Sequence, residues 1–374
     1  MSAPRLTISR RTRSTPFTPH VESAGVQAYT VYNHMLLPTS FRGVEADYWH
    51  LRTAVQIWDV GCERQVEVRG SDAARLAQLL TVRDLRSFAV GRCGYAPVCD
   101  HDGRLINDPV VLRLAEDRFW FSVADSDVVL WAGGLAHGLG LDVAVDEPDV
   151  WPLAVQGPLA EDTLAEVFGD EVRAIRFFRF AVLSFRGHPL VVARTGWSAQ
   201  GGFEIYVDDP DVGVALYEAV VAAGARFDIG PGCPNGIERI EAGLLSYGSD
   251  VTRADTALEA GLDRYCALDA PIEAIGIEAL RAQAARGVTR RISGLNIDGE
   301  AVPGIHGLWP IEVGGERVGS VTSAAWSPRL GTNVALAMLS TEHGGLGTEV
   351  MVTTPDGPRT ATVAAVPFGD PVTP

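Results

Sequence analysis

A polar segment between residues 193 and 208 carries side chains suited to binding a flat polar ring. The Gly, Ser and Gln residues at 196–202 predict a loop, and the alternation at 202–207 predicts a strand. On a strand Glu204 and Tyr206 lie on one face, because side chains alternate with a period of two. A carboxylate and a phenol beneath a loop that carries Trp197 would form one wall of a pocket. The alternative is an amphipathic strand that presents Glu204 and Tyr206 to water.

Two other groups of residues are candidates for chemistry. Tyr32 belongs to an alternating polar and aromatic stretch at 27–38 and either lines a pocket or ends a core strand. Cys93, Cys99 and His101 are close in sequence, but their spacing fits no standard zinc pattern and a fourth ligand is not evident. We therefore expect structural thiols and no metal site.

The composition limits the class of protein. A chain of 374 residues predicts two or three domains, and 47% hydrophobic with 21% charged residues is typical of globular proteins. The net charge of −16 argues against a nucleic-acid partner. Five cysteines, without a visible signal peptide, predict free thiols and a cytoplasmic location. No apolar run is long enough for a membrane span, so no membrane partner is expected.

The elements that must position these residues follow from periodicity and turn signals. An extended arm is expected over residues 1–20, and a compact α+β unit over 51–140. The pattern predicts helices at 45–55, 72–80, 127–138, 160–168, 212–223 and from 236. Ser71 or Asp72 is the expected N-cap of the second helix, and Gly224 is expected to end the helix at 212–223. Strands are predicted at 56–60, 65–69, 118–123, 151–158 and 190–195, and a hairpin over 94–113 with its turn at 101–103. After about residue 275, short strands at 304–307, 313–318 and 334–339 predict a small β-barrel or sandwich.

The usual catalytic signatures, such as a P-loop, G-x-G-x-x-G, G-x-S-x-G or H-E-x-x-H, are absent. Several segments together nevertheless resemble the folate-dependent aminomethyltransferase family of the glycine-cleavage T-protein. The resemblance rests on 58–60 with 66–72, on Leu153-Ala-Val-Gln-Gly-Pro158, on the 194–205 segment, on 239–248 with 256–262, and on 318–323, 327–330 and 333–337.

The resemblance implies an α+β, three-domain T-protein-like fold that binds tetrahydrofolate. The implied domains are a discontinuous folate-binding domain (1–50 and 141–270), a second α+β domain (51–140) and a C-terminal β-barrel or jelly-roll-like domain (275–374). It also implies that Glu204 binds the pterin edge, because a carboxylate can accept two N–H bonds from an aminopyrimidine. Tyr95 and Asp108 would also face the folate, and turn capping is the alternative role for Asp108.

Two departures from the family pattern narrow the expected reaction. Asn107 stands where T-proteins usually have the first of two Asp residues, and Trp197-Ser-Ala-Gln200 stands where relatives commonly have Tyr-Thr-Gly-Glu. With 11–18, 28–38, 62–66 and 175–180, these departures resemble the branch that demethylates dimethylsulfoniopropionate. That branch transfers a methyl group from a sulfonium to N5 of tetrahydrofolate, a reaction in which no leaving group has to be protonated.

The aromatic candidates for holding the sulfonium by cation–π attraction are Trp197, Tyr206 and Tyr32, with Phe17 a weaker one. Aromatic residues are more often part of a core, so a structural role is the alternative for each. A second hypothesis is a related folate enzyme with another methyl or one-carbon donor; an ether donor would require an acid, with His34 the nearest candidate. A third hypothesis is a folate-binding protein without turnover. The expected oligomeric state is a monomer or homodimer.

Overall fold

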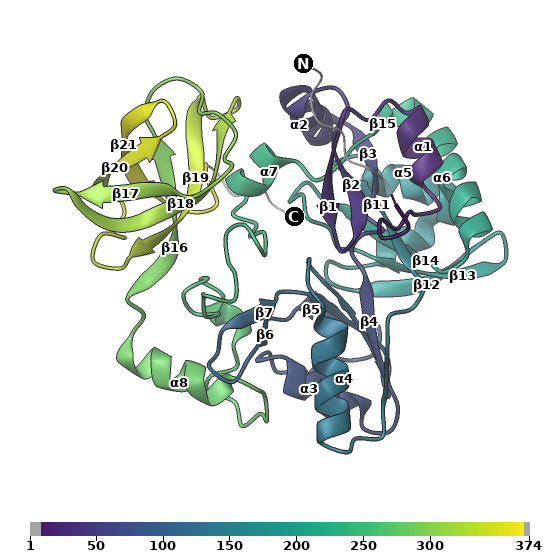
Figure 1. Ribbon diagram of the computed structural model, residues 1–374. Helices are drawn as coiled ribbons and strands as arrows, with labels where there is room; N and C mark the ends of the chain where they lie inside the picture. The colour runs from purple at the N-terminus through teal and green to yellow at the C-terminus, as the bar shows by residue number, and fades with distance from the viewer. Residues whose placement is uncertain (1–8, 370–374) are drawn as a thin grey trace.

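The computed structural model describes residues 9–369 and consists of three lobes (Figure 1). One lobe, on the upper right of Figure 1, is built on a six-stranded sheet, a second lies at the bottom, and a β-barrel lies on the upper left. The helix α7 (Gly236–Glu241) lies between the barrel and the upper-right lobe.

The upper-right lobe contains the segment that opened the sequence analysis. Its sheet has the order β12 (Phe180–Phe185), β13 (His188–Ala193), β14 (Gly202–Val207), β11 (Trp151–Gln156), β3 (Val55–Asp59) and β15 (Ile229–Pro231). The same lobe contains the hairpin β1 (Ala28–Tyr32) and β2 (Met35–Ser40), the helices α1 (Thr18–Ser23), α2 (Val44–Thr53), α5 (Ala160–Phe168) and α6 (Pro210–Gly224), and the 3-10 helices η1 (Asp170–Ala174) and η2 (Ala225–Phe227).

The core of this lobe lies between the sheet and the helices α5 and α6. Phe203, Ile205 and Val207 on β14 pack into it with Leu164 and Leu216 from the two helices. Because one face of β14 is fully used in this way, Glu204 and Tyr206 point to the opposite face.

The bottom lobe is a second α+β unit. Its sheet has the order β10 (Ala144–Asp146), β4 (Gln65–Arg69), β9 (Arg118–Ser122), β8 (Val110–Ala115) and β5 (Cys93–Tyr95); α3 (Ala73–Leu80), α4 (Val128–Gly138) and the short pair β6 (Val98–Cys99) and β7 (Leu105–Asn107) complete the lobe. The third lobe is a closed barrel of β16 (Arg290–Ile297), β19 (Thr332–Ser340), β18 (Glu316–Ser327), β17 (Trp309–Val313), β20 (Glu349–Thr354) and β21 (Gly357–Ala364). The 3-10 helix η3 (Asp263–Tyr265) and α8 (Ile277–Arg286) precede the barrel.

Buried polar contacts of α7 attach the barrel to the rest of the molecule. Glu241 accepts hydrogen bonds from Ser327 Oγ and, at 2.9 Å, from Arg329 Nη2, while Tyr48 Oη donates to the same carboxylate at 3.0 Å. Arg239 Nη2 donates to Ser323 Oγ at 2.5 Å. These contacts are buried, so α7 and the barrel are held as one unit.

Most predicted elements are confirmed within a few residues, including β4, α5 and β14, and the α+β class with a C-terminal barrel is confirmed. The boundaries of the three domains stay a prediction. β3, at 55–59, pairs with β11 in the upper-right sheet, although the predicted boundary at residue 51 assigns it to the second domain. Among residues 9–369, no helix is long and apolar enough to cross a membrane.

Several local predictions are wrong. The stretch 27–38 is a hairpin, because Asn33 and His34 adopt φ of 48° and 62° and turn the chain. Likewise 313–318 spans the tight turn between β17 and β18, and 304–307 forms no strand. Asp72 precedes α3 without capping it, since its side chain accepts from the Asp142 amide at 2.9 Å. By contrast, the predicted end of the 212–223 helix at Gly224 is confirmed, since Gly224 is the last residue of α6.

The predicted N-terminal arm is attached to the β1–β2 hairpin from Arg13 onward, while residues 1–8 lie outside the described part of the chain. Thr15 Oγ1 donates to Asp59 Oδ2 at 2.5 Å, and α1 begins at Thr18. Phe17 is 0% exposed and stacks on Tyr217 in the core of the upper-right lobe. Its suggested role in a sulfonium cage is therefore replaced by a packing role.

Candidate active site

Glu204 is a buried carboxyl group on the central strand β14. Only 7% of the residue is exposed, which excludes the alternative of a surface strand. Its Oε2 accepts from Thr195 Oγ1 at 2.5 Å and from Tyr206 Oη at 3.4 Å, and no residue in the described range 9–369 donates to Oε1. Burial raises the pKa of Glu204, against the lowering effect of these two hydroxyl donors. A buried carboxyl group with one oxygen unpaired is suited to accept N–H bonds from a bound ring.

At the start of β14, the backbone conformation and the close packing at residue 202 permit only glycine. Gly202 has φ of +138°, and a Cβ there would lie 2.3 Å from the carbonyl oxygen of Val155 on β11. Because β14 pairs with β11 residue by residue, this close approach fixes the register that places Glu204 opposite Ala154.

Tyr206 lies two residues further on the same face, as predicted. It is 2% exposed and packs against Trp120 of the bottom lobe at 5.6 Å between ring centroids. Burial raises the pKa of Tyr206, and the negative charge of Glu204 adds to the increase. The phenol is therefore neutral. Its hydroxyl group donates a hydrogen bond to Glu204, and its ring packs against Trp120 of the bottom lobe.

Asp108 and Tyr95 form a second acidic pair. Tyr95 Oη donates to Asp108 Oδ2 at 2.6 Å, which gives Asp108 a side-chain partner instead of the alternative role of capping a turn. Burial raises the pKa of Asp108 to about 7 despite this hydrogen bond. The Tyr95 ring is tilted against Tyr265 at 4.9 Å, so an aromatic wall lies beside the carboxyl group.

Tyr32 is half-buried at the end of β1, where the next residue attaches the hairpin to the bottom lobe. Asn33 Nδ2 donates to the carbonyl of Cys62 at 3.0 Å, and the Asn33 amide donates to Asp125 Oδ1 at 2.8 Å. Burial is the main effect that raises the pKa of Tyr32, and the negative charges of Glu63 and Asp108 raise it further. Tyr32 is therefore held near both carboxylates.

Glu63 is a site residue that the sequence analysis did not identify. It follows β3 in a turn closed by a hydrogen bond from its amide to the Val60 carbonyl at 2.9 Å. Burial raises its pKa well above the usual range, and the charges of Glu204 and Asp108 raise it further. Three carboxyl groups from three separate segments thus lie near one another, and a cation bound beside them would favour their ionised forms over the neutral forms that burial favours. No periodic signal marked Glu63, because it lies in an irregular turn.

Trp197 is anchored at a different side of the loop. Its indole Nε1 donates to the Leu245 carbonyl at 3.2 Å, and the Arg239 guanidinium lies 5.7 Å from its ring centroid. One face of the indole therefore already meets a cation, and a methyl donor would have to use the other. The contacts found do not join Trp197 directly to Tyr206 or Tyr32, so their joint role as a cage stays a prediction.

Asn107, the departure from the family's Asp pair, has a structural role. Its Nδ2 donates to the Ala124 carbonyl at 3.1 Å and to Ser126 Oγ at 2.8 Å, while its Oδ1 accepts from the Ala124 amide at 3.0 Å. Because two of the three bonds need an N–H donor, a carboxylate could not replace this amide.

Of the remaining candidates, Cys93 packs in the same buried cluster as Tyr206, whereas Cys99 packs in another. Residues 9–369 contain no group of three or more potential metal ligands. All five cysteines are free and buried. His34 is exposed in the β1–β2 turn.

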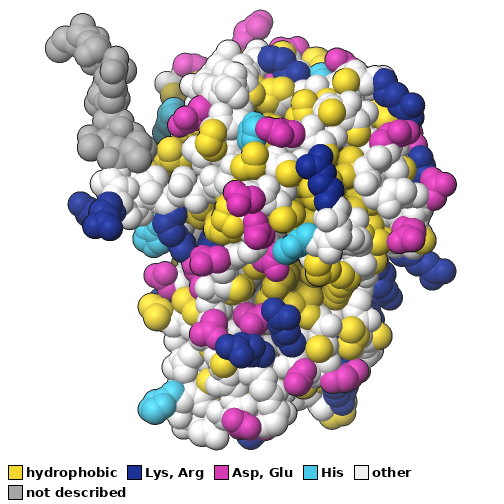
Figure 2. Space-filling view, turned by 90° about the vertical axis from the view of Figure 1, so that its right-hand side faces the viewer, with side chains coloured by type: hydrophobic (Ala, Val, Ile, Leu, Met, Phe, Trp, Pro, Cys, Tyr) yellow, Lys and Arg dark blue, Asp and Glu magenta, His cyan; other side chains and the backbone are white. Residues whose placement is uncertain are grey.

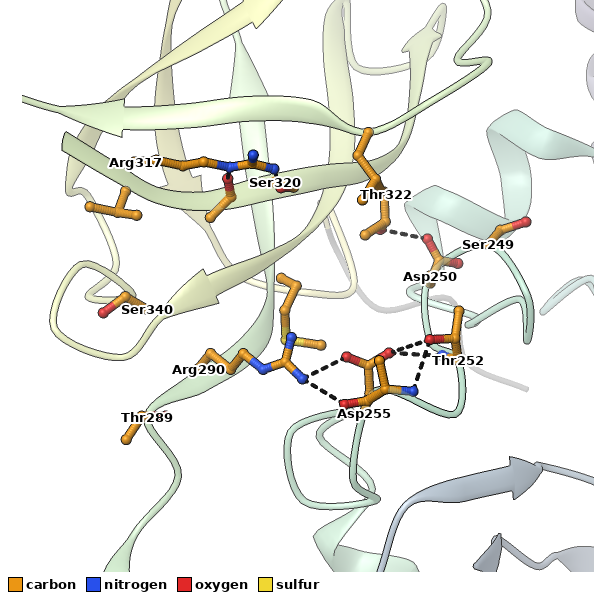
Figure 3. Close-up of a pocket in the computed structure, with 15 residues that line it drawn as sticks. Ser249, Asp250, Thr252, Asp255, Thr289, Arg290, Arg317, Ser320, Thr322 and Ser340 are labelled. Atoms are coloured by element: carbon orange, nitrogen blue, oxygen red, sulfur yellow. Dashed lines mark hydrogen bonds and ion pairs between the residues drawn. The ribbon is translucent and has the colours of Figure 1, made fainter. Parts of the chain in front are cut away.

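A cavity of about 420 Å³ lies between the barrel and the segment 249–255, away from the predicted residues (Figure 3). Its charged groups are largely paired with one another. Arg290 contacts Asp255 at 3.0 Å and Glu259 at 3.1 Å, and Arg317 donates to Ser320 Oγ at 2.7 Å. None of the six predicted site residues lines it, so the acidic and aromatic group around Glu204 remains the candidate site.

Comparisons with known proteins identify the family and the fold of this chain. The family model of the GCVT N-terminal domain matches residues 17–270, and that of the glycine cleavage T-protein C-terminal barrel domain matches 290–370. The dimethylsulfoniopropionate demethylase of Ruegeria pomeroyi is 52% identical over 355 residues, covering 95% of this chain and 97% of the relative. An aminomethyltransferase of Rubrobacter xylanophilus is 34% identical, covering 89% of this chain and 88% of the relative. The glycine cleavage system aminomethyltransferase T of Bartonella henselae has the same fold, with a TM-score of 0.86, 23% identity, and coverage of 97% of this chain and 99% of that one.

Proposed function

We propose, from the premise that the chain belongs to the glycine cleavage T-protein family, that it is a tetrahydrofolate-dependent demethylase of dimethylsulfoniopropionate. The products are methylmercaptopropionate and 5-methyltetrahydrofolate. The observation that carries the proposal is the 52% identity, over almost the whole of both chains, to a demethylase of that name. The acidic and aromatic surroundings of Glu204 support it, because the methyl donor reacts through a positively charged sulfonium group.

The residues present fit a reduced pterin. Glu204 offers an unpaired carboxylate oxygen at the base of the site, and we assign it to the N–H edge of the ring. Tyr95 and Asp108 are assigned to the same ligand, with Asp108 held by the 2.6 Å bond from Tyr95. When bound, tetrahydrofolate supplies the N5 lone pair that accepts the methyl group.

The protein's contribution is alignment and electrostatics rather than acid catalysis. A sulfonium leaves as a neutral thioether, so no proton is required at the leaving group. A sulfonium beside Glu63, Glu204 and Asp108 would favour the ionised forms of these buried carboxyl groups, and we assign Trp197, Tyr206 and Tyr32 to contacts with the donor. Holding the two reactants in line is worth several kcal/mol.

The structural role of Asn107 favours this reaction over glycine cleavage. The position that relatives use for an acid is occupied by an amide whose hydrogen bonds are all made within the protein. The site therefore lacks a group that could handle a released amine at that position.

A panel of methyl donors tests the proposal. The purified protein is incubated with tetrahydrofolate and either dimethylsulfoniopropionate, a methylated amine, an aryl methyl ether or glycine with its lipoyl carrier. We expect 5-methyltetrahydrofolate with the sulfonium donor alone. Formation of 5-methyltetrahydrofolate from another methyl donor, or of 5,10-methylenetetrahydrofolate and ammonia from the aminomethyl donor, without turnover of the sulfonium, would support the related-enzyme alternative. Folate binding without any turnover would support a binding protein.

Three further properties are part of the proposal. The five free, buried cysteines support a reducing, cytoplasmic location. The charge of −16, and basic side chains that in Figure 2 are interspersed with acidic ones, support the absence of a nucleic-acid partner. We expect a monomer or a homodimer, which sedimentation at two protein concentrations would distinguish.

A further inference from the structure

The loop that carries Trp197 has a backbone that needs external support. Between residues 196 and 202, Gly196, Ala199, Gly201 and Gly202 all have positive φ, and Ala199, at +53°, has a side chain that disfavours this conformation. Few hydrogen bonds of the loop stabilise this conformation. Ser198 Oγ donates to Gln156 Oε1 on β11 at 2.7 Å and accepts from the Gln200 amide at 3.2 Å.

Two side chains of the loop reach across to α7: Trp197 lies against Arg239, and Gln200 forms a hydrogen bond with Glu238. Gln200 Nε2 donates to Glu238 Oε1 at 3.0 Å, and Glu238 is 1% exposed. Glu238 directly precedes Arg239 in α7, and this helix is joined to the barrel through buried hydrogen bonds of Arg239 and Glu241. The Gln200–Glu238 contact therefore connects the Trp197 loop to a helix that is itself bonded to the barrel.

The carboxyl group of Glu238 has no structural requirement that explains its burial. Its Oε2 is buried and finds no hydrogen-bond partner in the described chain. It borders a small cavity of about 50 Å³ lined also by Arg52, Glu241 and Arg329. The two arginines bond or pair with Glu241 rather than with Glu238. A buried, half-paired carboxyl group costs stability, so its retention points to a role beyond packing.

We propose that Glu238 is a positioning residue that, through Gln200, holds the 196–202 loop and thereby sets the site's affinity for the methyl donor. This inference rests on the proposed function, because it assigns Trp197 to the donor. It also gives a physical reason for Gln200 itself: the Glu that relatives commonly have at this position would lie against a second carboxyl group. The pairing of an amide donor with a carboxyl acceptor avoids that repulsion.

Four variants test the inference. Glu238→Leu and Gln200→Leu each remove the hydrogen bond at similar volume, one from the helix and one from the half-buried loop. Glu238→Gln keeps an acceptor oxygen. Thr163→Val, which removes a buried 2.9 Å bond to the Leu159 carbonyl in α5, is the control for losing a comparable contact elsewhere.

Loss of one such hydrogen bond corresponds to about a five-fold change in a binding constant. We expect both leucine variants to raise the KM for dimethylsulfoniopropionate by about five-fold and to leave the KM for tetrahydrofolate within about two-fold. Hydrogen exchange of the peptide covering 196–202 should accelerate in both. In Glu238→Gln, which keeps the acceptor oxygen, the donor KM and the exchange rate of the 196–202 peptide should equal those of the unaltered protein. Thr163→Val should change neither quantity.

Unchanged exchange and an unchanged donor KM in both leucine variants would overturn the inference. So would an equal rise in both KM values, which would indicate general loosening of the site. If the unaltered protein does not use the sulfonium donor, the proposed function fails by itself. The exchange measurements then decide the role of Glu238: acceleration confined to the leucine variants supports it, and its absence contradicts it.

Discussion

Glu204 combines two properties that are difficult to obtain in one residue: it is buried, and it is incompletely paired. Its position follows from the alternation of β14, whose other face fills the core beneath α5 and α6. The sequence therefore predicted that Glu204 and Tyr206 share a face. It did not predict that both would be buried, because burial of that face depends on Trp120, a residue on a separate lobe.

Replacing Glu204 tests the assignment of the pterin site. Glu204→Ala should weaken tetrahydrofolate binding by about 1–3 kcal/mol, roughly 5- to 150-fold in Kd, because the N–H groups of the ring lose their acceptor. Isothermal titration calorimetry measures the change. Asp59→Asn is the matched control, since Asp59 is a buried carboxyl group whose partners are Thr15 and Gly61 rather than site residues. Equal affinities for Glu204→Ala and the control would show that the pterin binds elsewhere.

The residues that sequence reasoning missed lie in irregular segments. Glu63 is in a turn after β3, and its closeness to Glu204 and Asp108 arises only when three segments distant in sequence meet. Phe17 was assigned to the wrong environment for a related reason. An aromatic residue in a Pro-rich segment gives no periodicity, so its insertion into the core was not visible.

At the scale of elements, the contact between the β1–β2 hairpin and the 124–126 loop determines where Tyr32 lies. Asn33 and Asn107 approach that loop from two lobes, and both donate to the Ala124 carbonyl, at 3.4 and 3.1 Å. The sequence suggested one continuous strand here because the alternation of side chains continues through the turn. An alternating sequence pattern does not reveal the positive φ values of Asn33 and His34. Only the pairing of β1 with β2 shows that the chain turns there.

Asn107→Asp should destabilise the protein without creating aminomethyl chemistry. The carboxylate loses the two donated bonds and faces the Ala124 carbonyl, at a cost of about 1–3 kcal/mol. Urea denaturation measures the free energy of unfolding. Asn296→Asp, on the barrel strand β16, is the control and should cost less than about 0.5 kcal/mol, because no side-chain hydrogen bond of Asn296 is found in the described chain. A fully stable Asn107→Asp variant that gains glycine-cleavage activity would contradict the structural role of the amide.

For the whole molecule, stability depends on carboxyl groups that anchor distant segments. Asp59 attaches the N-terminal segment to β3 through Thr15, without a basic partner. Burial raises its pKa from 3.8 to about 6. Between these values the folded protein holds a proton that the unfolded chain has released, so the free energy of unfolding falls as the pH rises.

The Asp59→Asn variant isolates this effect. Its stability relative to the unaltered protein should increase by about 2–3 kcal/mol between pH 3.5 and pH 7 (about 1.36 kcal/mol per pKa unit) and stay constant above pH 7. Chemical denaturation of both proteins at pH values across this range measures the difference. A constant difference throughout would mean that Asp59 does not hold a raised pKa.

The three-lobed architecture was predicted from the family resemblance, and composition and periodicity alone would have given only a multidomain α+β protein. The closed barrel was expected from short strands after residue 275, but the order of its strands depends on long-range pairing that a local pattern does not contain. The attachment of the barrel through Glu241 and Arg239 was likewise invisible, since charged residues within an apolar helix predict burial but not the partner.

The central claim is the transfer of an intact methyl group from a sulfonium to tetrahydrofolate. Dimethylsulfoniopropionate with fully deuterated S-methyl groups is supplied with unlabelled tetrahydrofolate, and the folate product is analysed by mass spectrometry. We expect 5-methyltetrahydrofolate that carries the complete deuterated methyl group, with formation of methylmercaptopropionate in equal amount. A folate product without the label, or no folate product at saturating donor, would contradict the account.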